Sequence, residues 1–140
     1  MLGQTLPDYE LLVYALQDSF PIIRLSTLTV IRQARDVATV EGELFFHNGF
    51  RLRVQEVVRF DVTPPQITWY GYEVWRGDEK LYWYDSQPHP DDPALAATDP
   101  HHKHVPPNIK HHRVPAPHLS FTRPNLPVLI EEIAALGATA

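Results

Sequence analysis

Eight of the fourteen prolines in this sequence fall between Pro88 and Pro117. Proline has no backbone N–H and a fixed φ angle, so neither a helix nor a central strand can occupy most of this span. A connection of this length within a compact domain is usually functional or disordered. Apolar residues at regular intervals are available to anchor it: Leu95, Val105, Ile109, Val114, Leu119 and Phe121. We therefore expect residues 86–124 to form an ordered arm that lies across a sheet.

The N-terminal segment has the pattern of an amphipathic helix. Thr5 and Asp8 resemble a capping box, and Pro7 is acceptable in a first helical turn. The apolar residues that would form one buried face are Tyr9, Leu12, Val13, Leu16 and Phe20. Pro21 is expected to end the helix, because it cannot donate a helical hydrogen bond.

Residues 22–85 have the composition of β-strands and are rich in Val, Ile, Thr, Tyr and Trp. The pattern predicts a five-stranded antiparallel meander with strands over residues 22–35, 38–46, 50–60, 66–76 and 79–85. Pro64 and Pro65 separate the third strand from the fourth, because neither can donate to a central ladder.

The register of the first hairpin follows from its apolar residues. A three-residue loop over 47–49 places Leu44 opposite Leu52, with Gly49 in the left-handed conformation that such loops require. A two-residue turn would instead set Leu44 opposite Arg53. Because a slip of one residue reverses the faces of a strand, we expect the three-residue loop.

The second hairpin is predicted to turn at Gly77 and Asp78. A two-residue turn there pairs Tyr72 with Trp83 on an apolar face and Trp75 with Lys80 on the opposite face. The aromatic residues expected to face the core are Phe46, Tyr70, Tyr72 and Trp83.

A second helix is expected over residues 125–137, with Asn125 as its N-cap and Gly137 as its C′ residue. Its buried face would consist of Leu126, Leu129, Ile130 and Ile133. The predicted fold is therefore α+β in a single domain over residues 1–140. The first helix and the sheet would occupy 1–85, the arm 86–124 and the C-terminal helix 125–137.

The composition excludes several classes of protein. The sequence has no cysteine, so neither a disulfide framework nor a thiolate metal site is possible. The N-terminus has no basic segment followed by an apolar run, and we expect no signal peptide. The apolar stretches are shorter than the roughly 20 residues of a membrane-spanning helix. A cytoplasmic location without a membrane partner is the expectation.

Charge is distributed unevenly along the chain. The formal net charge is −5, which argues against a protein that coats nucleic acid through its overall charge. Residues 99–123 nevertheless carry six of the eight histidines and a single acidic residue, Asp99. The basic residues of this segment are Lys103, Lys110, Arg113 and Arg123. A basic segment that gains charge as the pH falls, on an acidic body, indicates a functional surface.

The polar residues of this region allow two kinds of catalytic or metal chemistry. In the first, His102 and His104 bind a metal ion together with Asp85, His89 or His112, but the spacing of two histidines in an irregular loop is a weak signal. The second is metal-independent cleavage of RNA. It needs a general base, a general acid and a cation beside the developing charge, which histidines and a lysine or arginine supply.

Two further interpretations involve no catalysis. The arm could bind a phosphate, RNA or protein partner, with bases stacked on exposed aromatics such as Trp69 or Trp75. Alternatively, the histidines could hold a proline-rich arm in place by ring stacking and hydrogen bonds. Six histidines within 25 residues are more than packing alone requires.

The order of these residues resembles a known family. The resemblance lies in Trp83-Tyr84-Asp85, then Pro88-His89-Pro90, then Pro100-His101-His102-Lys103-His104-Val105, and the family is the TumE-type family of bacterial toxin–antitoxin proteins. Residues 106–127 resemble a cyanobacterial or thermophile-associated branch of it. The resemblance covers most of the chain from about Leu44 onward. It implies a toxin that acts on RNA and a small antitoxin, often with a DNA-binding helix-turn-helix.

One working hypothesis follows from the resemblance and the residue chemistry. We expect a toxin-like component of a type II toxin–antitoxin module that acts on RNA by metal-independent endoribonuclease chemistry, without a cofactor. His102 and His104 would be the acid–base pair. Lys103 and Arg113 would stabilise charge at the phosphate, and Asp85 would orient a histidine. The further residues expected to bind phosphate or RNA are Tyr84, His89, His101, Lys110, His111, His112 and Arg113.

The sequence is also compatible with two alternatives to this hypothesis. One is a non-catalytic protein- or RNA-binding module, which could form a homodimer. The other is a small metalloprotein with histidine ligands. The partners expected under the working hypothesis are RNA and a small antitoxin protein.

Overall fold

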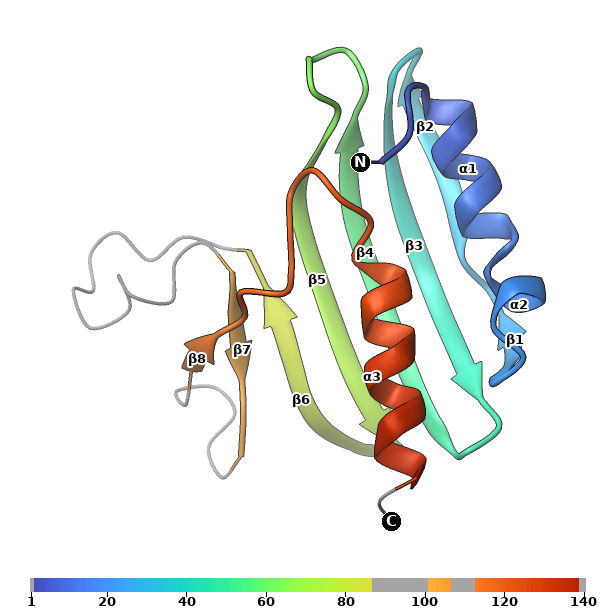
Figure 1. Cartoon of the computed structure of the whole chain (residues 1–140), viewed down its shortest axis with the longest axis vertical. Helices are drawn as coiled ribbons and strands as arrows, with labels where there is room; N and C mark the ends of the chain where they lie inside the picture. Colours follow the sequence, from blue (N-terminus) through green and yellow to red (C-terminus); the bar gives the residue numbers. More distant parts are fainter. Residues whose placement is uncertain (1, 87–100, 107–112, 139–140) are drawn as a thin grey trace.

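The computed structural model describes residues 2–86, 101–106 and 113–138 (Figure 1). The helices in these residues are α1 (Leu6–Tyr14), α2 (Leu16–Ser19) and α3 (Leu126–Ala138). The strands are β1 (Ile23–Ser26), β2 (Thr29–Ala34), β3 (Val37–Phe46), β4 (Phe50–Arg59), β5 (Gln66–Arg76), β6 (Glu79–Asp85), β7 (His102–His104) and β8 (Arg113–Pro115). No helix among the described residues is long and apolar enough to cross a membrane.

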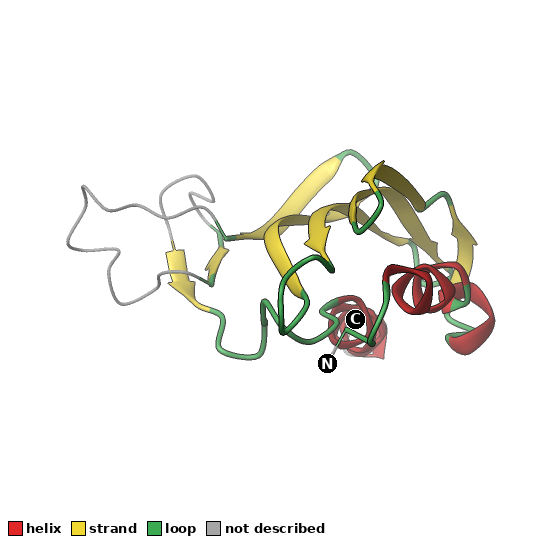
Figure 2. Cartoon of the chain, turned by 90° about the horizontal axis from the view of Figure 1, so that it is seen from above, coloured by secondary structure: helices red, strands yellow, loops and turns green. Residues whose placement is uncertain are grey.

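All eight strands belong to one antiparallel sheet. Seven follow the order β1-β3-β4-β5-β6-β7-β8. The eighth strand, β2, also pairs with β3, along the N-terminal part of β3, whereas β1 pairs with its C-terminal end. The three helices lie on one face of this sheet, and we call the other face the open face (Figure 2). The main hydrophobic core lies between the sheet and the helices, which leaves the open face available for other contacts.

The predicted helices are confirmed in position, but the single N-terminal helix that was predicted is divided at Ala15 into α1 and α2. Thr5 and Asp8 form the capping box of α1, and the predicted apolar face of α1 and α2 is buried or packs against the core. All four apolar residues predicted for the buried face of α3 are fully buried. The prediction for Gly137 is wrong, because α3 continues through it. A Cβ at Gly137 would lie 2.6 Å from Nδ2 of Asn48, so this glycine allows close packing of α3 against the first hairpin.

The register of the first hairpin is confirmed. Leu44 pairs with Leu52, and Gly49 has a φ of 89°. The five-strand meander is incorrect at both ends. The first predicted strand is divided into β1 and β2, because its backbone at Thr27 passes close to Gly42; a Cβ on Gly42 would lie 2.5 Å from the carbonyl oxygen of Thr27. At the other end, β7 and β8 extend the sheet beyond β6.

The arm therefore differs from the prediction in part. Residues 102–104 and 113–115 extend the sheet instead of crossing it. The proline-free run 101–105 is long enough for β7, and β8 lies at the edge of the sheet, where Pro115 is tolerated. The segment after β8 does pack against the core through Leu119 and Phe121. The carbonyl oxygen of Phe121 accepts a hydrogen bond of 2.7 Å from the N–H of Ile67. Val114 is exposed, while the predicted anchors Leu95 and Ile109 lie outside the described residues.

A bulge in the second hairpin reverses the predicted faces of β6. Trp75 pairs with Lys80 as expected, but Val74 pairs with Tyr82, so Leu81 is the extra residue. Tyr82 is therefore buried with Tyr84 on the helix side, and the prediction that Trp83 faces the core is wrong. The hydroxyls of both tyrosines donate to Glu132 of α3, at 3.0 and 2.7 Å.

A buried carboxyl joins the helices to the middle of the sheet. Glu56 of β4 is 1% exposed and accepts hydrogen bonds of 2.5 Å from the hydroxyls of Tyr9 in α1 and Tyr72 in β5. The Tyr72 oxygen also accepts a bond of 3.1 Å from Nδ2 of Asn125, directly before α3. Burial raises the pKa of Glu56, and the two tyrosine bonds oppose this only in part.

We predict that the stability of the Glu56→Gln variant, relative to that of the wild type, increases as the pH rises. The raised pKa means that the folded protein holds the Glu56 proton more tightly than the unfolded chain does. The resulting stability is fully present below the ordinary pKa of 4.5 and is lost as the pH rises through the folded pKa. Thermal melts of both proteins from pH 4 to 8 measure the difference. The exposed residue Glu41 provides the control, Glu41→Gln, and a pH-independent difference for Glu56→Gln would contradict the prediction.

Candidate functional site

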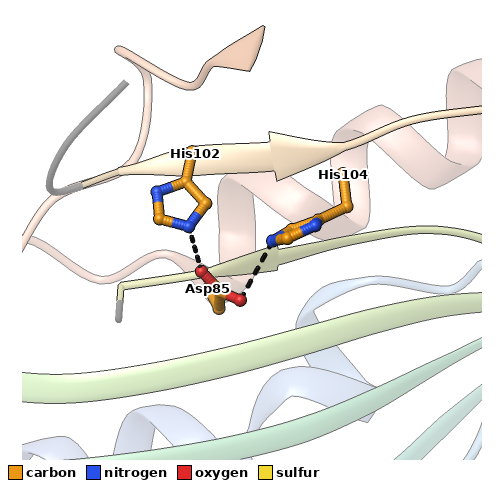
Figure 3. Close-up of side chains that lie close together, drawn as sticks. All are labelled: Asp85, His102 and His104. Carbon is orange, nitrogen blue, oxygen red and sulfur yellow. Dashed lines mark hydrogen bonds and ion pairs between the residues drawn. The ribbon is translucent and has the colours of Figure 1, made fainter. Parts of the chain in front are cut away.

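The pairing of β6 with β7 brings three predicted site residues together. Asp85 is opposite His102, and Trp83 is opposite His104. Because side chains alternate along a strand, all four lie on the same side of this pair of strands. Figure 3 shows both imidazoles directed at the Asp85 carboxylate.

The contacts within this cluster are direct. Nε2 of His104 lies 3.0 Å from Oδ2 of Asp85, and Nε2 of His102 contacts Oδ1 of the same carboxylate. His102 is 0% exposed and His104 is 2% exposed, whereas the Asp85 side chain is 20% exposed. Burial by itself would raise the pKa of Asp85, but hydrogen bonds from His102 and His104 outweigh it and hold this pKa well below its usual range.

Trp83 packs on the cluster from the same side. Its ring stacks on His104 with a centroid distance of 4.2 Å and an interplanar angle of 18°. Its indole Nε1 lies 3.4 Å from Oδ2 of Asp85, a long contact. The Lys80 ammonium lies 4.4 Å from the Trp83 ring centroid, on the same strand. Trp83 thereby fixes the ring plane of His104 and connects the cluster to a cationic neighbour.

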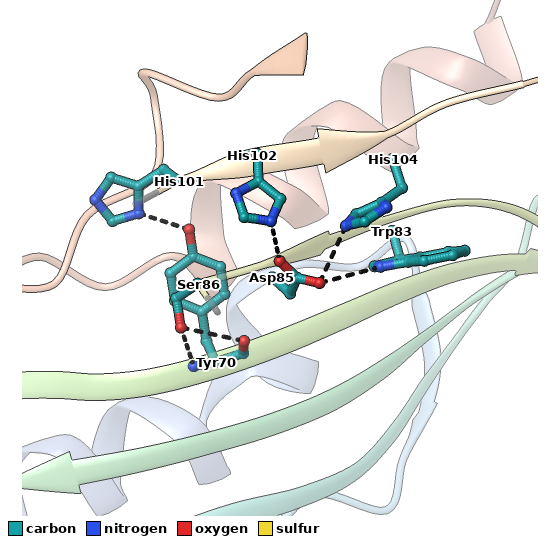
Figure 4. Close-up of polar contacts among 7 residues, drawn as sticks. All are labelled: Tyr70, Trp83, Asp85, Ser86, His101, His102 and His104. Carbon is teal, nitrogen blue, oxygen red and sulfur yellow. Dashed lines mark hydrogen bonds and ion pairs between the residues drawn. The ribbon is translucent and has the colours of Figure 1, made fainter. Parts of the chain in front are cut away.

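Ser86 fixes the end of β6, immediately after the cluster. Its hydroxyl oxygen accepts a hydrogen bond of 3.0 Å from the N–H of Tyr70 in β5 (Figure 4). The Ser86 N–H also donates to the carbonyl oxygen of Tyr70 at 3.3 Å. These two bonds continue the β5–β6 pairing past Asp85 and so hold the backbone of Asp85 in the sheet.

A hollow of about 290 Å³ lies beside the cluster on the open face. Of the three clustered residues, Asp85 lines it, together with Trp69, Trp83 and Arg53. Gly71 is opposite Asp85 in the register, and a Cβ there would lie 3.4 Å from the Trp69 ring. The missing side chain at Gly71 therefore leaves space between Trp69 and the carboxylate.

Arg53 is the cation that faces this hollow without a partner among the described residues. The neighbouring cations on the open face are paired: Arg51 with Glu43, and Lys80 with Glu73. A second hollow of about 500 Å³ extends toward β2 and shares Arg53 and Gln55 with the first. The open face is thus recessed on both sides of an exposed arginine, and one end of the recess reaches Asp85.

Lys103 does not join the two histidines. It pairs with Tyr84 in the register, on the helix side of the sheet. Its ammonium lies 4.1 Å from the ring centroid of Tyr82 and 4.0 Å from a carboxylate oxygen of Glu132. The predicted grouping of Lys103 with the histidines did not allow for the alternation of a strand, which places neighbouring residues on opposite faces.

His101 also lies on the helix side. Its Nδ1 is 2.6 Å from the Tyr70 hydroxyl, and its ring stacks on Tyr70 and packs against Phe121 at a centroid distance of 4.4 Å (Figure 4). This environment is that of a packed histidine, as the structural interpretation of the arm expected. The predicted phosphate- or RNA-binding residues His89, Lys110, His111 and His112 lie outside the described residues, as does the side chain of Arg113.

Little in the sequence marked Arg53, Trp83 and Gly71 as site residues. Arg53 alternates with Arg51 along β4 and lies opposite Glu43 and Glu73, which is the pattern of an ordinary solvated face. Placing Trp83 on the open face requires the bulge at Leu81. That bulge is a shift of a single residue in the register. Gly71 in the interior of a strand was the one available signal, because it often marks close approach of another group.

We predict that Asp85→Asn lowers the stability of the protein near neutral pH, by roughly 1–3 kcal/mol, because both imidazoles lose a charged acceptor. A depressed pKa contributes stability that is present above the ordinary value of 3.8 and is lost as the pH falls through the folded pKa. The difference between wild type and variant should therefore shrink as the pH falls below about 4. Urea unfolding at each pH measures it, and the exposed turn variant Asp78→Asn is the control. A difference that does not shrink below about pH 4 would contradict the prediction.

Comparison with known proteins gives a family match. The model of the family described as Toxin TumE matches residues 12–136, which is most of the chain. No curated protein and no solved structure matches. The matched region contains every residue of the cluster and of the adjoining hollow, and it confirms the resemblance seen in the sequence. This chain belongs to the TumE toxin family.

Proposed function

We propose that this chain is the toxin of a type II toxin–antitoxin module and that it cleaves RNA by acid–base chemistry without a metal ion. The observation that carries the proposal is the placement of Asp85, with both of its imidazole partners, at the end of a hollow on the open face. Family membership supports the toxin role. The target and the chemistry are inferred from the side chains.

The hollow has the chemistry of a nucleotide site. Trp69 is 39% exposed and offers an indole face for stacking with a base. Arg53, unpaired among the described residues, offers a guanidinium to a phosphate. Neither interaction depends on base identity, so the hollow suits an unpaired RNA strand of varied sequence.

The proposed reaction is an attack by the 2′-hydroxyl on the adjacent phosphorus. The imidazole of either His102 or His104 accepts the hydroxyl proton, and the imidazole of the other histidine donates a proton to the departing 5′-oxygen. Asp85 holds both rings by their Nε2 atoms, and Arg53 takes the charge-stabilising role that we first expected of Lys103. The products are a 2′,3′-cyclic phosphate and a 5′-hydroxyl, so no water is consumed in this step.

The burial of the two imidazoles adds one requirement. Proton transfer needs a ring nitrogen within about 3 Å of the reacting oxygen. Asp85 lines the hollow, whereas both imidazoles are buried behind it. The proposal therefore includes a small displacement of the carboxylate from the two Nε2 atoms when RNA binds.

The first test is expression in a bacterial host, with growth and total RNA integrity as readouts. We expect arrest and RNA cleavage with the wild-type chain, and relief by co-expression of the neighbouring open reading frame as the antitoxin. His102→Asn and His104→Asn should each abolish arrest. The matched control is His118→Asn, an exposed histidine beside Glu132 on the helix side, which should arrest growth like wild type.

Folding of each variant is checked by circular dichroism, because both target histidines are buried. A folded His102 or His104 variant that still arrests growth would remove that residue from the mechanism. Normal growth and intact RNA with the wild-type chain would contradict the proposal and favour a non-catalytic binding module.

The second test concerns the hollow. Trp69→Ala and Arg53→Ala should each raise KM for a short single-stranded RNA by about tenfold, with a smaller effect on kcat, because stacking or a charged hydrogen bond contributes about 1–3 kcal/mol. The matched control is Arg59→Ala, an exposed arginine at the far end of β4 that pairs with Asp61. An unchanged KM in both hollow variants would exclude the hollow as the RNA site.

A further inference from the structure

Asp85, His102 and His104 also have the composition of a metal site. One ligand atom from each lies within 4.8 Å of the others. Two imidazole nitrogens and one carboxylate oxygen are donors that suit Zn²⁺ and other first-row divalent ions, and they leave one tetrahedral position open. From these observations we infer that the cluster binds one such ion, and that the bound ion suppresses RNA cleavage.

The backbone positions the donors in advance. His102 and His104 are two residues apart on a strand, so both imidazoles are on the same side, and Asp85 faces them from the paired strand. Two ligands about 2.1 Å from a tetrahedral ion lie roughly 3.4 Å apart. The distance of 3.0 Å between Nε2 of His104 and Oδ2 of Asp85 is close to this value, so small side-chain rotations would admit the ion.

The surroundings support an ion at this position. Both imidazoles are buried, which limits competition from water for their lone pairs. The stacked Trp83 holds the His104 ring, and groups that orient first-shell ligands strengthen metal sites. The open fourth position would lie on the side of Asp85 that lines the hollow, where a water molecule can complete the coordination.

The suppression of cleavage follows from shared atoms, and this part of the inference rests on the proposed function. The Nε2 atoms that would carry protons in acid–base catalysis are the atoms that would bind the ion. A metal-bound Nε2 has no lone pair left to accept a proton. One cluster therefore cannot hold the ion and perform acid–base chemistry at the same time.

Metal binding is tested on the purified full chain after treatment with EDTA and its removal. Titration with Zn²⁺ by calorimetry, and with Co²⁺ by visible absorption, should show one ion per chain with tetrahedral Co²⁺ bands. His102→Asn, His104→Asn and Asp85→Asn should each weaken Zn²⁺ binding at least tenfold, whereas His118→Asn should not. A rise in the wild-type Tm with Zn²⁺ gives an independent readout that needs no variant.

Absence of uptake, or equal affinity in all four variants, would overturn the metal site whether or not the chain cleaves RNA. For suppression, the same wild-type preparation is assayed with a single-stranded RNA in EDTA and with one equivalent of Zn²⁺. Cleavage in EDTA and its loss with Zn²⁺ supports the inference. Cleavage only with Zn²⁺ would overturn both the suppression by the ion and the metal-independent mechanism. Absence of cleavage both in EDTA and with Zn²⁺ would overturn the proposed function. The metal site would then be decided by the binding titration alone.

Discussion

The pairing of β7 with β6 is the interaction on which the rest of the site depends. Three residues of the proline-rich region add a strand to an otherwise regular sheet, and their register sets Asp85 opposite His102. Without this pairing the histidines would have no defined position relative to the carboxylate. The strand is short because prolines border the run from 101 to 105, and its position is supported by the Trp83–His104 stacking and the contacts with Asp85.

The two faces of this strand pair have different environments. On the open face, a carboxylate with a depressed pKa is held by two imidazoles beside a recessed surface. On the helix side, Lys103, Glu132 and the hydroxyls of Tyr82 and Tyr84 form a second polar group that anchors α3 to β6. The alternation of a strand thus divides consecutive arm residues into a candidate reactive group and a structural one.

Much of the fold could be predicted from the sequence wherever local rules decide the outcome. The capping box at Thr5 and Asp8 and the register through Leu44 and Leu52 depend on residues close in sequence, and both were correct. The bulge at Leu81 could not be predicted, because the gain from placing two tyrosines against Glu132 comes from a helix about fifty residues away. The same limit applies to β7, because its partner strand β6 ends at Asp85, far before β7 begins at His102 in the sequence.

The candidate site could be predicted in its residue types but not in its arrangement. Asp85, His102 and His104 were selected from the sequence, and the structure brings them together. The cation was assigned to Lys103 because it lies between the two histidines in sequence, although this position turns it to the other face. Arg53 could be recognised as a site residue only from the structure of the sheet, which places it in the same hollow as Asp85.

In the proposed mechanism, two imidazoles perform the chemistry on RNA through the 2′-hydroxyl, and the ends of the products record that route. The direct measurement is mass spectrometry of a defined single-stranded RNA after incubation with the purified chain in EDTA. We predict fragments with a 2′,3′-cyclic phosphate and a 5′-hydroxyl. Fragments with a 3′-hydroxyl and a 5′-phosphate would show attack by water instead of the 2′-hydroxyl and would contradict the acid–base mechanism at this cluster.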